Sequence, residues 1–193
     1  MGSAQLEEED PPLAVRAFFG LPVPDAQRAA LGRYLVDCAA AAPAFRWTAS
    51  ANLHLTLRFL GQVETAAAQR IAGNLAALPL RSFAIELGEA GAFRSGRLAR
   101  VVWLGLRVGA DEARELARQL EVECLASGLP AEPRPLHPHL TLARARSRLG
   151  SALPELPAPP AVAPWRADEV VLYRSRLGRD GAVYEPLRIV RLS

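Results

Sequence analysis

The chain has 193 residues, which is enough for one well-buried domain or for two small lobes that share a core. Half of the residues are hydrophobic and 22% are charged, which indicates a globular protein and excludes a disordered one. The formal net charge of +3 suits an anionic ligand without requiring one, and no apolar run is long enough to predict a membrane span.

The first half of the chain alternates between strand and helix patterns. Residues 15–22 predict a strand, and residues 25–41 predict an Ala- and Leu-rich helix with an acid in its first turn. A second strand covers residues 53–61 and is expected to stop at a glycine. Residues 64–78 carry isoleucine and leucine at helical spacing, which predicts a second helix.

The middle of the chain predicts a hairpin and the clearest helix. Two strands are expected over residues 83–87 and 98–108, with a glycine-rich turn over Gly88–Gly96 between them. Residues 111–127 have acids in the first turn, apolar residues at four-residue spacing and a glycine past the end. This combination predicts an amphipathic helix with one face in the core.

The last third of the chain predicts strands separated by proline-rich connections. Several prolines precede a strand at residues 139–142. Residues 150–164 are rich in Pro and Ala, which indicates an extended surface loop. Residues 169–192 predict a closing hairpin with a glycine-containing turn.

The cysteines and the N-terminal residues favour a cytoplasmic location. Cys38 and Cys124 lie far apart in helical-looking stretches, with neither metal-ligand spacing nor a disulfide framework, so reduced core cysteines are expected. Residues 1–10 are acidic and lack the hydrophobic centre of a signal peptide. We expect residues 1–11 to be a disordered leader.

The tetrapeptide His-Leu-Thr-Leu occurs twice and uses two of the three histidines in the chain. Histidine has an ordinary pKa of about 6.5, so its charge changes near neutral pH. Alternate side chains of a strand share a face, so His54 lies with Thr56, and His139 with Thr141, opposite the leucines. One such copy is typical of any half-buried strand. Two identical copies predict two acid/base groups around one small anion.

The duplication also predicts the architecture. The expected element order is β-α-β-α-β-β-α-β-β-β, and each copy of the motif follows a helix. This order favours two similar lobes that face each other across a cleft, in an α+β fold. We expect a single bilobal domain over residues 12–193.

Longer stretches around the motifs carry a resemblance to a known family. Asn52–Gly61 is similar to its first signature, Pro138–Arg144 to its second, and Leu172–Ser175 to its C-terminal hairpin. The chain resembles the two-histidine phosphoesterase superfamily, in the RNA 2′,3′-cyclic phosphodiesterase (2′-5′ RNA ligase-like) branch, over about residues 14–192. One departure is Ser50, where the family commonly has a proline; we expect it to alter a turn and not the chemistry.

The resemblance implies a bilobal fold with antiparallel sheets lining a central cleft and helices outside. It implies hydrolysis of an RNA-terminal 2′,3′-cyclic phosphate to a 2′-phosphomonoester without a metal or other cofactor. His54 would protonate the leaving 3′ oxygen and His139 would deprotonate water. Thr56 and Thr141 would bind the non-bridging phosphate oxygens. The implied partners are RNA 3′ ends or small nucleotides with a cyclic phosphate, bound by a monomer.

Two arginines and the third histidine leave alternatives open. Arg144 matches a family position near the phosphate, but it lies five residues after His139 and reaches the site only if the strand ends or bulges there. Otherwise it is a solvated surface arginine. Arg58 lies an even number of residues after His54, so strand alternation would place it on the histidine face. Alternatively, it is solvated or paired with a helix. His137 suggests a metal site, but Pro138 interrupts the strand and no further ligand completes the shell, so we expect no metal.

Some aromatic residues and two other functions also stay open. Phe45, Trp47 and Tyr173 are expected either to stack on a terminal base or to pack in the core. Ligation of tRNA halves through a 2′-5′ bond is the reverse reaction, which we rank as a side activity because water drives hydrolysis. A non-catalytic RNA-end binding protein is the third possibility, against which the intact His and Thr of both motifs argue.

Overall fold

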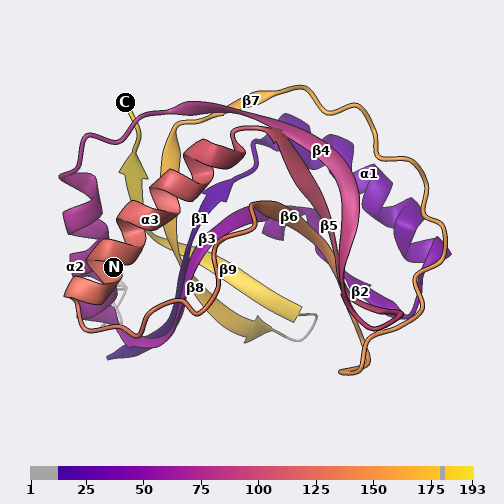
Figure 1. Ribbon diagram of the computed structural model, residues 1–193, viewed down its shortest axis with the longest axis horizontal. Helices are drawn as coiled ribbons and strands as arrows, with labels where there is room; N and C mark the ends of the chain where they lie inside the picture. Colours follow the sequence, from indigo (N-terminus) through magenta and orange to yellow (C-terminus); the bar gives the residue numbers. More distant parts are fainter. Residues whose placement is uncertain (1–12, 179–180) are drawn as a thin grey trace, which may run out of the picture.

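The computed structural model describes residues 13–178 and 181–193, so the expected leader over residues 1–11 lies outside the described part of the chain (Figure 1). The described residues form nine strands, three α-helices and a one-turn 3₁₀ helix at Ser50–Asn52. The elements are β1 (Ala14–Pro22), α1 (Asp25–Ala41), β2 (Phe45–Trp47), β3 (His54–Glu64), α2 (Thr65–Ala76), β4 (Phe83–Ser95), β5 (Leu98–Val108), α3 (Ala110–Ala126), β6 (His139–Ala145), β7 (Trp165–Ala167), β8 (Glu169–Gly178) and β9 (Gly181–Arg191).

This order follows the sequence prediction, with two short strands, β2 and β7, added to it. None of the helices in the described ranges is both long and apolar enough to cross a membrane.

The strands form an antiparallel sheet in the order β7-β4-β5-β6-β3-β1-β8-β9, with β2 paired to β6. The sheet divides at its centre, because β3 and β6 pair through Leu55 and Leu140 alone. Strand β5 occupies one edge of β6, while β3 and β2 share the other edge. The fold is therefore α+β, as predicted, and its two halves meet at the two motif strands.

Helices flank each half of the sheet on the face that carries the leucines. Helices α2 and α3 pack against β1, β3 and β9, while α1 packs against β2 in the other half (Figure 1). In α3 the residues at four-residue spacing, Leu116, Leu120 and Cys124, are all buried. The leucines of both motifs belong to the same core. Apolar burial thus fixes which face of β3 and β6 points away from the helices.

Two glycine-containing segments differ from the sequence prediction. Gly61 does not end the strand; with a φ of 70° it forms part of a bulge, and β3 continues beyond it. The turn predicted over Gly88–Gly96 is mostly strand β4. Gly91 of that strand lies beneath the ring of Trp103, where a Cβ would come within 2.3 Å of a ring carbon. These glycines therefore permit close packing and bulging, and not a turn.

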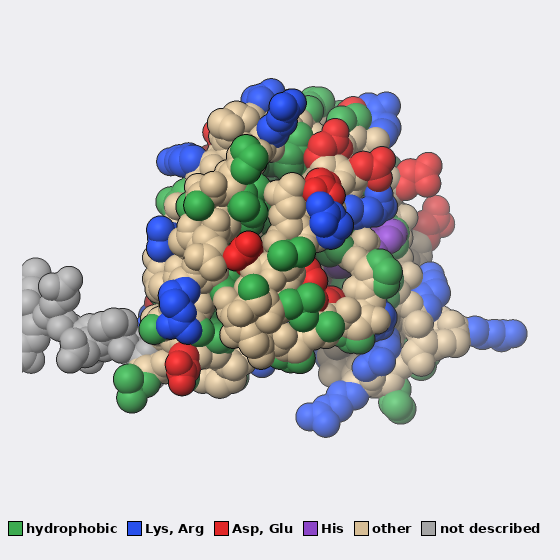
Figure 2. Space-filling model, turned by 60° about the vertical axis from the view of Figure 1, so that its left-hand side comes forward, with side chains coloured by type: hydrophobic (Ala, Val, Ile, Leu, Met, Phe, Trp, Pro, Cys, Tyr) green, Lys and Arg blue, Asp and Glu red, His purple; other side chains and the backbone are tan. Residues whose placement is uncertain are grey.

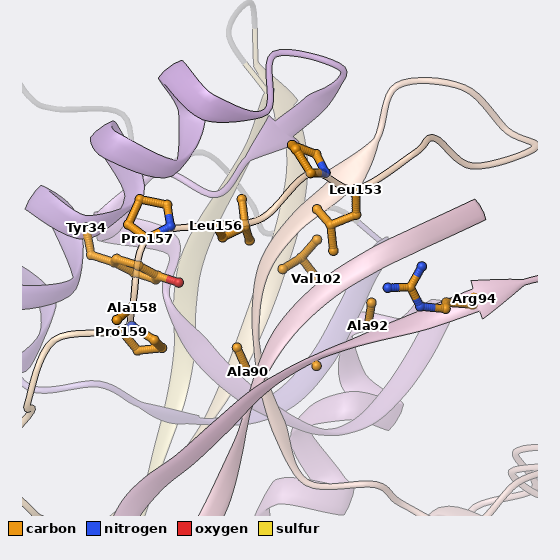
Figure 3. Close-up of a pocket in the computed structure, with 12 residues that line it drawn as sticks. Tyr34, Ala90, Ala92, Arg94, Val102, Leu153, Leu156, Pro157, Ala158 and Pro159 are labelled. Atoms are coloured by element: carbon orange, nitrogen blue, oxygen red, sulfur yellow. The ribbon is translucent and has the colours of Figure 1, made fainter. Parts of the chain in front are cut away.

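The proline-rich segment over Gly150–Pro164 is a loop, as predicted, with one isolated bridge at Ser151. A pocket of about 280 Å³ lies beneath it (Figure 3). The pocket is lined by Tyr34 of α1, Ala92 of β4 and Val102 of β5, together with the loop itself. Because Val102 belongs to the buried core, this pocket opens on the leucine face of the sheet.

Candidate functional site

The two His-Leu-Thr-Leu copies meet at the centre of the sheet. Leu55 and Leu140 pair across the joint, and both side chains are buried in the core. In an antiparallel pair, this register sets each motif histidine opposite the threonine of the other motif. The four polar side chains are half-buried on the face away from the helices. The structure thus brings together residues that the sequence separates widely.

His54 is held by two short contacts. Its Nδ1 lies 2.7 Å from the carbonyl oxygen of Asn52, which can only accept, so Nδ1 carries a proton. Nε2 of the neutral ring then accepts a hydrogen bond from Thr56 Oγ1 at 3.0 Å. Asn52 is itself fixed, because its Nδ2 donates to the carbonyl of Ala182 at 2.6 Å. The C-terminal hairpin therefore helps to orient the first histidine.

His139 repeats this arrangement on the second strand. Its Nδ1 lies 2.6 Å from the carbonyl oxygen of His137, two residues earlier, just as Asn52 precedes His54 by two. The same reasoning puts a proton on Nδ1 of the neutral ring. In both rings Nε2 is the nitrogen left to take or give a proton to a ligand.

Burial lowers the pKa of both rings. The pKa of His54 falls to about 4, chiefly because burial removes water from the charged form, and the charges of Arg144 and His139 lower it further. The hydrogen bond to the carbonyl two residues earlier opposes this effect. Burial also lowers the pKa of His139, and His137 and Arg144 add to the lowering. Both rings are therefore neutral at pH 7 in the free protein.

Arg144 reaches the histidine face because β6 contains a bulge. Leu142 is an extra residue between two of the pairs that β6 makes with β5. The bulge shifts the alternation by one position, so Arg144 shares the face of Thr141. The guanidinium acts on the pKa of both motif histidines, in agreement with this placement. The structure thus meets the condition under which the sequence predicted a role for Arg144.

The family described as LigT like phosphoesterase matches residues 21–103 and 105–184, which include both motifs and the strands that carry them. The chain belongs to the LigT-like phosphoesterase family. This result confirms the two-histidine phosphoesterase resemblance drawn from the duplicated motif.

Two curated relatives of this LigT-like phosphoesterase carry the name RNA 2′,3′-cyclic phosphodiesterase. The relative from Aeropyrum pernix is 35% identical over 145 residues, which cover 72% of this chain and 82% of that protein. The relative from Methanothermobacter thermautotrophicus is 32% identical over 188 residues, which cover 93% of this chain and all of that protein. The similarity therefore extends well beyond the two motifs.

Solved structures show the same fold. LigT of E. coli, crystallised with 3′-AMP, superposes with a TM-score of 0.78 at 30% identity and covers 93% of this chain and 99% of its own. TT0787 of Thermus thermophilus gives a TM-score of 0.76 at 26% identity, covering 92% of this chain and 97% of its own. The predicted fold class is confirmed.

In this LigT-like phosphoesterase, Arg58 has no place at the site. A bulge in β3 next to Leu57 turns Arg58 to the helix face, where it is 8% exposed. Its Nε donates to Glu121 of α3 at 2.5 Å, and its Nη1 lies 3.1 Å from Glu132. It also donates to the carbonyl of Pro130 at 2.6 Å. Of the alternatives drawn from the sequence, pairing with a helix is the one observed.

His137 lies beside the site in an aromatic setting. Its ring centroid is 4.9 Å from that of Trp103, 5.5 Å from that of Phe93 and 6.0 Å from that of His139. Across residues 13–178 and 181–193, no three His, Cys, Asp or Glu side chains gather closely enough to hold a metal ion. The side chain of His137 therefore contributes chiefly to the packing around its neighbour.

Aromatic rings surround both histidines, and the sequence prediction missed most of them. The ring centroid of Phe18 lies 4.7 Å from that of His54, and Tyr184 lies 5.1 Å away on another side. Phe93 lies 5.0 Å from His139. Phe18 belongs to a continuous apolar run in β1, in which hydrophobic periodicity does not distinguish the two faces. Only the pairing of distant strands reveals these neighbours.

The three aromatic residues singled out from the sequence divide between core and site. Phe45 is 1% exposed in the core, and Trp47 packs against the core while donating to the carbonyl of Ala42 at 3.2 Å. Tyr173 stacks on Phe18 at 5.1 Å and so belongs to the ring cluster beside the first histidine.

Proposed function

We propose that the chain is a metal-independent RNA 2′,3′-cyclic phosphodiesterase that opens an RNA-terminal cyclic phosphate to a 2′-phosphomonoester. The observation that carries the proposal is the convergence of two histidines, each with an adjacent threonine, on one face of the sheet. The names of the relatives support the substrate class. The 3′-AMP in the complex with E. coli LigT is a nucleoside monophosphate, similar in size to the terminal nucleotide of an RNA chain.

The reaction needs one proton donor and one proton acceptor on opposite sides of phosphorus. His139 Nε2 takes a proton from water, and the water oxygen bonds to phosphorus. The bond from phosphorus to O3′ breaks, and His54 Nε2 delivers its proton to that leaving oxygen. The 2′ ester bond remains, so the product is a 2′-phosphate with a free 3′-hydroxyl. Acid and base groups of this kind each contribute about 10²–10⁴-fold in rate.

The bound phosphate supplies the protonation state that the free protein lacks. Both rings are neutral at pH 7 because burial lowers their pKa values. A phosphate anion between them stabilises a positive ring and so raises the pKa values again. Thr56, Thr141 and Arg144 bind the non-bridging oxygens, where negative charge grows in the transition state. Both histidines come from one chain, and we propose that the enzyme acts as a cytoplasmic monomer.

The test uses purified protein, adenosine 2′,3′-cyclic monophosphate and excess EDTA, with the product isomer identified by chromatography. The wild type should form the 2′-phosphate at an unchanged rate in EDTA. His54→Ala and His139→Ala should each lower kcat/KM by at least about 10²-fold while circular dichroism shows an intact fold. His137→Ala, the matched control for removal of an imidazole, should retain most of its activity. Loss of activity on chelation would refute the proposal, and so would activity in a variant that carries both His54→Ala and His139→Ala.

A further inference from the structure

Arg46 and Arg144 lie directly opposite each other in the short pair between β2 and β6. Residues directly opposite in an antiparallel pair project from the same face, with their Cβ atoms about 4.5–5.5 Å apart. Because the bulge in β6 turns Arg144 to the histidine face, Arg46 projects from that face as well. Both side chains are exposed. In the space-filling view, arginine side chains lie near the histidine that reaches the surface, and acidic side chains lie on one side of it (Figure 2).

The charges of this pair are not compensated within residues 13–178 and 181–193. Two other cross-strand arginines face acids: Arg174 pairs with Glu185, and Arg191 with Glu169. Neither Arg46 nor Arg144 makes an ion pair in the described structure. Like charges directly opposite on a sheet are destabilising. Such an arrangement favours an anion that binds between or beside the two guanidinium groups.

The order of side chains along the face places both arginines at the same end of the site. On β6 the face carries His139, then Thr141, then Arg144. His54 of β3 lies opposite Thr141 on the edge of β6 that β2 also occupies, so Arg46 lies farther along that edge, beside Arg144. In the same cross-strand row, Phe93 of β4 is exposed on this side and its ring contacts His139. Arg144 is the guanidinium whose charge acts on the pKa of both motif histidines, so we assign Arg144 to the cyclic phosphate and Arg46 to a neighbouring one.

We propose that Arg46 binds a second phosphate of the substrate, adjacent to the cyclic one, so that the enzyme prefers RNA ends over cyclic mononucleotides. This inference rests on the proposed function. In a chain that ends in a 2′,3′-cyclic phosphate, the only adjoining phosphate is the one on the 5′ side of the terminal nucleoside. The planar guanidinium offers two parallel donors to its oxygens. Arg144 binds the cyclic phosphate, and Arg46 binds its neighbour.

The test compares two probes that differ by one group: adenosine 2′,3′-cyclic monophosphate with and without a 5′-phosphate. For the wild type we expect kcat/KM about ten-fold or more higher with the 5′-phosphate, and a steeper fall of that value with salt. In Arg46→Ala the ratio of the two kcat/KM values should fall toward one, and Arg46→Lys should keep part of it. Arg70→Ala removes an exposed arginine on α2 and should keep the wild-type ratio.

If the ratio of the two kcat/KM values is unchanged in Arg46→Ala, the inference is overturned, even if both kcat/KM values fall. If the wild type hydrolyses neither probe, the proposed function fails instead, and binding then tests Arg46 by itself. In that case Arg46→Ala should weaken binding of adenosine 3′,5′-bisphosphate about ten-fold more than binding of 3′-AMP. Equal weakening of both would overturn the inference.

Discussion

Burial suppresses the charge of both His54 and His139. It lowers the pKa of His54 to about 4, and it also lowers the pKa of His139. In the free protein at pH 7 both rings are therefore neutral. The resemblance assigns the acid role to His54, so that ring must be charged when the substrate is bound. The two apparent pKa values belong to the coupled pair.

These lowered pKa values predict the pH dependence of catalysis. The proposed mechanism needs one charged and one neutral ring, a state that is scarce at pH 7 because both pKa values lie below 6.5. We expect kcat/KM to rise as the pH falls below 7 and to decline again below about pH 4, once His54 is charged in the free protein as well. The kcat profile should lie at higher pH, because the bound phosphate favours charged rings.

Rate measurements across this pH range with adenosine 2′,3′-cyclic monophosphate provide the check, and Arg144→Ala is the informative variant. Removing a nearby cation raises both histidine pKa values, so its kcat/KM profile should move to higher pH even though its rate is lower. A kcat/KM that is flat between pH 7 and pH 4 would contradict the arrangement.

At the scale of elements, bulges decide which arginine faces the motif histidines. Each motif strand takes up an extra residue at the third position after its histidine, at Leu57 in β3 and at Leu142 in β6. After the bulge, Arg58 lies fourth from its histidine and turns inward, whereas Arg144 lies fifth and turns to the site. A shift of one residue thus separates an arginine that pairs with α3 from one that faces the histidines.

We predict opposite consequences when these two arginines are removed. Arg58→Ala leaves Glu121 partly buried without its partner, and should lower the free energy of unfolding by about 2–4 kcal/mol in urea titrations. Its kcat/KM per folded molecule should stay close to that of the wild type. Arg144→Ala should unfold at a urea concentration no lower than that of the wild type, because it relieves the repulsion with Arg46, but it should lose about 10-fold or more in kcat/KM. The reverse pattern would show that the strand alternation has been assigned to the wrong faces.

The same bulges mark the limit of prediction from the sequence. Local periodicity predicted the helices, the leucine faces and the polar faces of both motifs, because these depend on near neighbours. The faces of Arg58 and Arg144 depend on where an extra residue enters a ladder with a distant strand. Gly91, which the sequence places in a turn, likewise lies in a strand at a point where the ring of Trp103 leaves no room for a Cβ. Such features are set by long-range pairing, which a single sequence does not display.

At the scale of the whole molecule, one chain supplies both histidines of the site. Strand β3 comes from the first half of the chain and β6 from the second, and they pair within the same sheet. A mixture of His54→Ala and His139→Ala proteins should therefore stay as inactive as either variant alone. The check is the rate of cyclic phosphate hydrolysis after the two proteins are unfolded and refolded together. Recovered activity would mean that subunits exchange strands to build shared sites.

The matching bulges also place different side chains at equivalent positions of the two halves. The residue that reaches the site face after the bulge is Arg144 in β6, and its counterpart in β3 is Phe59, whose ring lies 5.7 Å from that of Phe18. A local two-fold relation thus repeats the imidazole and the hydroxyl but replaces a cation with a phenyl group. A nucleic acid strand has a direction, and this replacement makes the two ends of the histidine face unequal. We therefore expect the ligand to bind in one polarity, with its phosphate toward the guanidinium.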